Sequence, residues 1–199
     1  MKVRIAIVVL VVLFLLIMGY GYMNKVDYSS ATTFSVAIKK LEPLHQKLAK
    51  PEPGDWLESH EENGQSFIEY LESRPIRPTT KRNKLYVLPL GTFNKRASEI
   101  IADSATFMGL YFQIPVVLMK TEPLEHVPDY AKRVNPYAGM EQLLSTWVLD
   151  KYLKPQLPDD ALAMIAFTSI DLWPGEGWNY VFGQASLRGR VGVWSIARN

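Results

Sequence analysis

The apolar run Ala161–Phe167 constrains the fold of this chain more than any other feature. It reads Ala-Leu-Ala-Met-Ile-Ala-Phe, without a polar side chain, which is typical of a short strand buried on both faces of a sheet. Similar short runs occur at Leu85–Leu90 and Pro115–Met119. Segments with helical spacing separate the three runs. This alternation of strand and helix predicts parallel strands joined by right-handed crossovers.

Two amphipathic segments supply the predicted crossover helices. Asn94 is a suitable N-cap for the first helix and Gly109 a suitable stop. The second helix is expected to end before Pro155, because the residue before a proline avoids the helical conformation. The apolar face of the first helix comprises Ala97, Ile100, Ile101, Ala105 and Met108. The stripe of the second comprises Met140, Leu143, Leu144, Trp147 and Val148.

The chain beyond the central run is rich in aromatic residues and glycine. Short strands are predicted at Tyr180–Phe182 and Val191–Ile196, joined by a turn at Leu187–Arg190. Together with the three earlier runs they give the predicted fold class for residues 85–199. This class is α/β, with a mixed, mostly parallel five-stranded sheet and two packing helices.

Residues 1–24 have the composition of a membrane anchor. Two cations precede the apolar run Ile5–Met18, and the uncharged stretch continues to Met23. A helix of about 19 residues is roughly 28 Å long and just spans a hydrocarbon core. The N-terminal cations predict a single-pass signal-anchor, with the domain on the extracytoplasmic side. A cleaved signal peptide, with Gly19 and Gly21 before the cut, is the alternative, and it would leave the domain secreted or periplasmic.

Residues 25–84 are predicted to form a juxtamembrane helical extension and a linker. Apolar residues recur with helical spacing between Ser29 and Leu48, and Pro43 interrupts the pattern. The stretch Arg74–Lys84 carries two prolines and five basic residues, as an exposed connector does.

Charge and cysteine content exclude several classes of protein. Removing Lys2 and Arg4 from the 22 basic residues leaves 20, which balance the 20 acidic ones. A neutral domain without a basic run has no electrostatic footprint for nucleic acid, so nucleic acid is excluded as a partner. The absence of cysteine excludes disulfides, thiolate nucleophiles and cysteine metal ligands.

No segment of the sequence contains a complete catalytic motif or metal site. His60-Glu61 begins like the zinc motif HExxH, but Gly64 stands where the second histidine belongs. The two other histidines, His45 and His126, are isolated in the sequence. Asp171 follows the central strand, which can be a site in an open sheet, but hydrogen bonding within a turn is the expected role.

Four segments carry a family resemblance. They are Leu85-Tyr-Val-Leu-Pro-Leu-Gly91, Thr168-x-x-Asp171-Leu172, Trp178-Asn-Tyr-Val-Phe-Gly-Gln-Ala185 and Val191-Gly-Val-Trp-Ser-Ile196. Together they resemble the archaemetzincins, a metzincin-like family of zinc metallopeptidases. Upstream, Asp55–Leu57 and Glu62–Phe67 look like the N-terminal extension of the longer members. The resemblance covers Pro51 to Asn199.

The resemblance implies a peptidase whose zinc is bound by a helix carrying HExxHxxGxxH, with the glutamate as general base. In the family that helix follows the strand that matches Val191–Ile196, and the sequence stops before it. We therefore expect the N-terminal portion of an enzyme with peptide or protein substrates. Zinc is expected for the complete family, and this chain by itself is expected to bind none and to be inactive.

The resemblance transfers one site to this chain, an edge strand that pairs with an extended peptide through main-chain hydrogen bonds. Its residues are Tyr180, Val181, Phe182, Gly183, Gln184 and Ala185. An ordinary edge strand whose aromatic residues fill the core is the alternative reading. For the whole chain, the alternative is a non-catalytic, membrane-anchored remnant that binds a peptide or protein partner along this strand.

Overall fold

The computed structural model describes residues 29–198, except residues 47 and 61. The anchor predicted over residues 1–24 therefore lies outside the described part of the chain. Among the described residues, no helix combines the length and apolar character needed to cross a bilayer. The chain divides into two compact units, Met1–Pro75 and Ile76–Asn199.

The described part of the first unit contains helices joined by irregular segments. Its helices are α2 (Ser29–Leu41), the 3-10 helix η1 (Glu42–Leu44), α3 (Trp56–Ser59) and α4 (Phe67–Glu72). The predicted helix with a break at Pro43 is confirmed up to Leu44, because α2 ends at Leu41 and the proline lies in η1, but among the described residues no helix follows toward Leu48. At α4, Ser66 and Glu69 form a capping box in which each side chain satisfies the other's backbone N–H.

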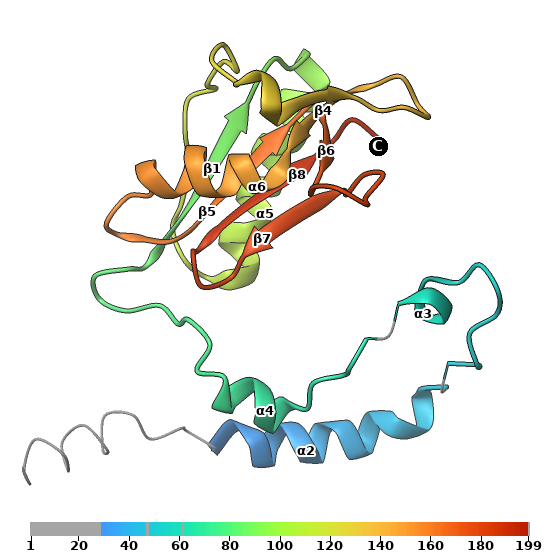
Figure 1. Ribbon diagram of the computed structural model, residues 1–199. Helices are drawn as coiled ribbons and strands as arrows, with labels where there is room; N and C mark the ends of the chain where they lie inside the picture. The colour runs from blue at the N-terminus through green and yellow to red at the C-terminus, as the bar shows by residue number, and fades with distance from the viewer. Residues whose placement is uncertain (1–28, 47, 61, 199) are drawn as a thin grey trace, which may run out of the picture. The chain divides into compact units, whose positions relative to one another are not determined.

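The second unit is an α/β domain built on two sheets (Figure 1). Its strands are β1 (Lys84–Leu90), β2 (Val116–Leu118), β3 (Lys132–Val134), β4 (Glu141–Leu144), β5 (Ala161–Thr168), β6 (Asp171–Trp173), β7 (Gly183–Ser186) and β8 (Val191–Ser195). Its helices are α5 (Lys95–Phe112), η2 (Asp129–Ala131), α6 (Ser145–Trp147), the π-helix η3 (Val148–Leu153) and η4 (Lys154–Gln156).

The larger sheet has five strands in the order β2-β1-β5-β8-β7. The pairs β1–β2, β1–β5 and β5–β8 are parallel, and β7 runs antiparallel to β8. The predicted mixed, mostly parallel five-stranded sheet is therefore confirmed. Its central strand is β5, formed by the apolar run Ala161–Phe167 and Thr168.

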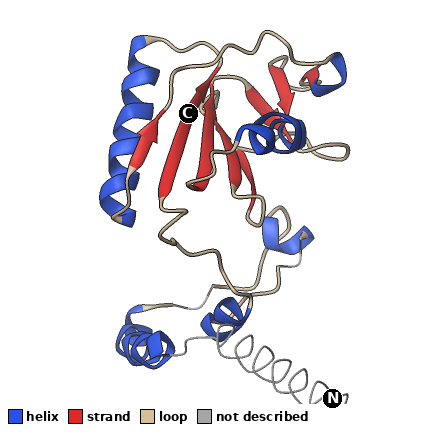
Figure 2. Cartoon of the chain, turned by 90° about the vertical axis from the view of Figure 1, so that its left-hand side faces the viewer, coloured by secondary structure: helices blue, strands red, loops and turns tan. Residues whose placement is uncertain are grey.

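Successive residues of a strand point to opposite faces of the sheet. In the larger sheet, each face packs against a different helix. On one face, Leu88 and Val193 belong to a core cluster with Val148 and Leu153 of η3. On the other face, Val87 packs with residues of α5, which runs along one side of the sheet (Figure 2). The β7 edge lies at the end of the sheet opposite β2.

The smaller sheet, β3-β4-β6, corrects the second helix expected from sequence. The apolar stripe from Met140 to Val148 predicted one helix, but Gln142–Leu144 pair in parallel with Asp171–Trp173. Helical structure begins at Ser145 and continues through Pro155, which lies in η4. Pairing with a strand distant in sequence overrides the local helical period here.

The helix α5 is capped as predicted but ends later than predicted. Asn94 Oδ1 accepts a hydrogen bond from the N–H of Ala97 at 2.9 Å. Gly109, the predicted stop, lies inside the helix, where glycine is tolerated at a cost of about 1 kcal/mol. The helix ends at Phe112, and its C-cap Gln113 adopts the left-handed conformation with φ 53°. The predicted apolar face is wrong at Ile100, which is 46% exposed.

The hairpin also differs from its predicted boundaries. The turn at Leu187–Arg190 is confirmed, because Arg190 N–H donates to Leu187 O at 3.2 Å. The strand predicted at Tyr180–Phe182 is wrong, since β7 begins at Gly183. The reason is that Val181 N–H donates to Leu172 O of β6 at 2.9 Å, which draws the preceding segment toward the smaller sheet.

Candidate functional site

The strand β7 is the last strand of the larger sheet, so one of its two edges is unpaired among the described residues. It pairs with β8 on its other side, with Gly183 opposite Trp194 and Ala185 opposite Gly192. An unpaired edge presents main-chain donors and acceptors that can hydrogen-bond another extended chain. The free edge of β7 is therefore the candidate binding site of this domain.

The hydrogen-bond pattern shows which residues present their main chain at this edge. Ser195 N–H donates to Phe182 O at 2.8 Å, so the main chain of Phe182 points toward β8. Main-chain groups alternate between the two sides of a strand. Gln184 therefore also points toward β8, whereas the N–H and C=O groups of Gly183 and Ala185 point outward.

The structure divides the six predicted site residues into two groups. Gly183, Gln184 and Ala185 lie in β7, as predicted for an edge strand. Tyr180, Val181 and Phe182 precede it, and the outward edge at Val181 is occupied by Leu172. The free edge therefore begins at Gly183 and is shorter than the sequence suggested.

The side chains around β7 hold it against the neighbouring elements. Ser145 Oγ, at the start of α6, donates to Gln184 Oε1 at 2.6 Å. Phe182 is 54% exposed and meets Tyr180 edge-to-face, with ring centroids 5.4 Å apart. The guanidinium of Arg198 lies 3.7 Å from the centroid of the Tyr180 ring, a cation–π contact.

A buried ion pair lies beneath this segment. Asp171 is 1% exposed and accepts two hydrogen bonds from Arg198, from Nε at 2.8 Å and from Nη2 at 2.7 Å. Gln142 Nε2 donates to the same carboxylate at 2.7 Å. Burial alone would raise the pKa of Asp171, but the hydrogen bonds from Arg198 and Gln142 outweigh it and hold the pKa below its usual value. The sequence-based role of Asp171 in a turn is thus wrong.

The same polar network holds the segment before β7. Gln142 Nε2 also donates to Asn179 O at 3.0 Å. Arg133 Nη2 donates to Trp178 O at 2.9 Å and to Asn179 O at 2.8 Å, and its Nε donates to Gln142 Oε1 at 2.8 Å. Carbonyl groups of the segment are thereby bound to β3 and β4, which fixes the path of the chain into β7.

Sequence reasoning did not find this network. Its members come from β3, β4, β6, the segment after β6 and the residues after β8, and they are as far apart as Arg133 and Arg198. The available signal was the carboxylate of Asp171 between the apolar run Ala161–Phe167 and the apolar pair Leu172-Trp173, because such a carboxylate needs a partner if it is buried. No local pattern indicates that Gln142 and Arg198 are the partners.

The described residues offer no fit for a zinc ion, because they contain no group of three or more His, Cys, Asp or Glu side chains placed to bind a metal. His60 stacks on Trp56 with ring centroids 3.7 Å apart. His45 and His126 are exposed. We therefore derive no catalytic step through zinc from these residues.

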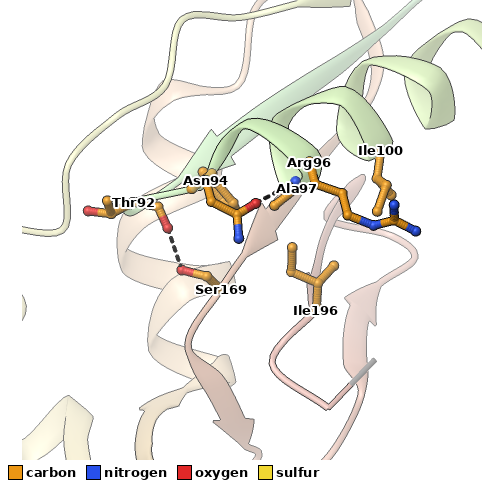
Figure 3. Close-up of a pocket in the computed structure, with 8 residues that line it drawn as sticks. Thr92, Asn94, Arg96, Ala97, Ile100, Ser169 and Ile196 are labelled. Carbon is orange, nitrogen blue, oxygen red and sulfur yellow. Dashed lines mark hydrogen bonds between the residues drawn. The ribbon is translucent and has the colours of Figure 1, made fainter.

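A cavity of about 520 Å³ lies where the parallel strands β1, β5 and β8 end (Figure 3). Ligands often bind at the carboxyl ends of strands in open α/β sheets. Polar groups of its wall are engaged with each other, since Ser169 Oγ donates to Thr92 O at 2.8 Å and Asn94 caps α5. Arg96 contributes a charged side chain to the lining. The cavity therefore lies where sheets of this kind often bind ligands, but its lining residues do not indicate a particular ligand.

Comparison with known proteins gives one consistent family. No protein-family model matches the chain. Archaemetzincin-2 of Pongo abelii is 33% identical over 184 residues, which cover 88% of this chain and 49% of the relative. Archaemetzincin-2 of Homo sapiens is 33% identical over 181 residues with the same coverage. Archaemetzincin-1 of Homo sapiens is 27% identical over 152 residues, covering 72% of this chain and 29% of the relative.

Two solved structures are also similar. The archaemetzincin of Archaeoglobus fulgidus, crystallised with malonate, is 26% identical and has a TM-score of 0.42, with 58% of this chain and 61% of that chain covered. The archaemetzincin of Methanopyrus kandleri is 26% identical and has a TM-score of 0.45, with 61% of this chain and 62% of that chain covered.

The fold is that of an α/β domain whose larger sheet ends, among the described residues, in the unpaired edge of β7. The similarity in sequence shows that this chain belongs to the archaemetzincin family, a family of zinc metallopeptidases. The chain spans about half the length of the archaemetzincin-2 relatives, 49% in the two proteins above.

Proposed function

We propose that this chain is the substrate-binding, N-terminal portion of an archaemetzincin-like zinc metallopeptidase, and that an extended peptide adds to the free edge of β7. Membership of the family supports a zinc metallopeptidase activity. We propose this activity for the whole protein and not for these residues alone, because the chain spans about half the length of its relatives. The outward main-chain groups of Gly183 and Ala185 carry the proposal. Strand addition uses main-chain groups of this kind for affinity.

In this proposal the polar network keeps the edge ready for binding. The segment Trp178–Phe182 is bound to β3, β4 and β6 before any peptide arrives. A peptide therefore gains its hydrogen bonds without ordering that segment, which lowers the entropic cost of association. The alternative, a partner protein that contributes a strand without being cleaved, uses the same groups.

We further propose that the 199 residues bind peptide without cleaving it. The sequence contains no HExxHxxGxxH, the motif that supplies zinc ligands and a general base in metzincins. Elemental analysis of the purified chain should find no stoichiometric zinc, and labelled peptides should remain intact. One zinc per chain together with hydrolysis would overturn this part of the proposal.

Peptide addition is tested by replacing Ala185 with proline. This change removes one outward N–H and leaves the ladder with β8 intact, because proline is tolerated where the N–H faces away from the sheet. The probe is a fluorescently labelled extended Val/Thr peptide, measured by anisotropy. The matched control is Ala185→Val, which keeps the N–H and suits a strand.

One lost main-chain hydrogen bond, about 0.5–1.5 kcal/mol, predicts affinity about 2- to 12-fold weaker for Ala185→Pro than for Ala185→Val. A probe peptide with N-methyl groups on alternate residues should also bind more weakly, because it lacks the donors facing β7. Equal binding by both variants and both probes would mean that the edge is not the binding site.

We also propose a single-pass membrane anchor over residues 1–24, with the domain on the extracytoplasmic side. The apolar run Ile5–Met18 behind two cations supports this proposal. In a fractionated membrane preparation, the chain should resist alkaline extraction and be digested by protease added on the extracytoplasmic side. Release of a shortened chain into the soluble fraction would instead favour the cleaved signal peptide.

A further inference from the structure

The indole of Trp194 lies flat on the sheet beside the free edge, in a position that depends on two glycines. A Cβ atom added to Gly183 would lie 2.4 Å from Cδ1 and 2.6 Å from Nε1 of the indole. One added to Gly192 would contact the benzene end of the ring, at 2.3 Å from Cζ3. The benzene end thus lies over β8 and the pyrrole end over β7. The ring crosses the last strand pair toward the unpaired edge.

This indole lies on the face of the sheet opposite the main core. Val191 and Val193 point into the core cluster, and Trp194 alternates with them. Trp194 remains 38% exposed although it covers both glycines. The pyrrole end of a partly exposed indole therefore lies immediately above Gly183, where the outward main-chain groups begin.

A peptide paired with β7 would bring a side chain to this surface. Residues directly opposite each other on neighbouring strands point to the same face of a sheet, with Cβ atoms about 4.5–5.5 Å apart. The peptide residue opposite Gly183 therefore directs its side chain to the face of Trp194. Because Gly183 has no side chain, that residue meets the edge of the indole directly.

The other face of the edge has a different character. Gln184 and Ser186 point to it, and Gln184 is hydrogen-bonded to Ser145. Peptide residues adjacent to the one opposite Gly183 would meet these polar side chains. The two faces of the edge thus differ in the side chains they accept.

We propose that Trp194 is a specificity-determining residue of this edge and selects a large apolar or aromatic side chain at the peptide position opposite Gly183. This inference rests on the proposed addition of a peptide to β7. The preferred ligand is an extended peptide with one large apolar residue flanked by residues that tolerate a polar environment. Edge-to-face contact with the indole and burial of the apolar side chain provide the preference.

The test compares two labelled peptides that differ at one central residue, phenylalanine or alanine, in a Val/Thr background. The wild-type chain should bind the phenylalanine peptide about 2- to 12-fold more tightly, as expected for an aromatic pair. In Trp194→Ala this ratio should fall to about one, and in Trp194→Phe a large part of it should remain. The control is Phe107→Ala, which removes an exposed aromatic residue from α5 and should leave the ratio unchanged.

A second readout reports contact with the indole of Trp194 directly. A peptide carrying bromophenylalanine at the central position should quench tryptophan fluorescence of the wild-type chain, and Trp194→Phe should abolish this quenching. Quenching that persists in Trp194→Phe, or a ratio near one in the wild type, overturns the role of Trp194 while peptide addition stands. If neither peptide binds the wild-type chain, peptide addition to β7 fails and the inference fails with it.

Discussion

Replacing Arg198 with alanine should destabilise the folded chain by about 3 kcal/mol at neutral pH. The change removes two charge-assisted hydrogen bonds, at 2.8 and 2.7 Å, from a carboxylate that is 1% exposed. Breaking a buried ion pair from one side costs about 3–5 kcal/mol, since the remaining charge stays buried without its partner. The lower end of this range applies because Gln142 still donates to Asp171 and the Arg198 side chain is 21% exposed.

The same substitution should change how stability depends on pH. In the wild type the pKa of Asp171 lies below its usual value, so the associated stability is present above about pH 4 and is lost as the pH falls through the folded-state pKa. In Arg198→Ala the effect of burial is offset only by the hydrogen bonds from Gln142 and the backbone, so the pKa of Asp171 should be higher than in the wild type. The stability gained by ionising Asp171 above about pH 4 should therefore be smaller in Arg198→Ala than in the wild type, and this difference should disappear in acid.

Urea unfolding at pH 7 and near pH 4 measures both effects. At pH 7 the midpoint of Arg198→Ala should lie on the order of 1–2 M below that of the wild type, and the gap should narrow in acid. Adding Asp171→Asn to Arg198→Ala should recover part of the loss, because no charge is then buried. Arg96→Ala, at the exposed start of α5, should change stability by less than about 0.5 kcal/mol. A loss below about 1 kcal/mol that is independent of pH would refute the reasoning.

Three further predictions concern single contacts. Gly183→Ala should destabilise the chain by about 1–3 kcal/mol by forcing the indole away, and in urea unfolding the same change should cost much less when it is made in a Trp194→Ala background. Asn94→Ala should cost about 1 kcal/mol by removing the cap of α5, and Asn94→Ser should cost less. Burial, with the hydrogen bond to Glu122, raises the pKa of Tyr152 to about 12. The stability that comes from the protonated hydroxyl of Tyr152 is therefore complete below about pH 10 and is lost as the pH rises to about 12. In Tyr152→Phe, the free energy of unfolding should not show this decrease between about pH 10 and 12.

The sequence predicted those structural elements that depend on residues close to one another in the chain. The apolar run Ala161–Phe167 is the central strand, because seven residues without polar groups need cover on both faces. Asn94 caps α5 because its side chain reaches a backbone N–H three residues away. The turn at Leu187–Arg190 also closes within itself. These features depend on neighbours in the chain.

Prediction failed where a distant segment competes with a local pattern. Residues 140–144 have helical spacing, but Gln142–Leu144 pair with β6 and form a strand. The expected strand at Tyr180–Phe182 gives way because Val181 bonds to Leu172. In both cases β6 is the competitor, and its pairing is not encoded in the period of either segment.

The sequence by itself determined the α/β class, the central position of β5 and the presence of an edge strand near Gly183. The hydrophobic pattern suffices for the first two features, because a run without polar side chains needs cover on both faces of a sheet, whereas the edge strand was implied by the family resemblance. The tertiary structure decided which main-chain groups face outward, which residues surround Asp171 and where the indole of Trp194 lies. Hydrogen bonds between remote residues and close packing over two glycines fix those features, and both depend on distances that exist after the chain has folded.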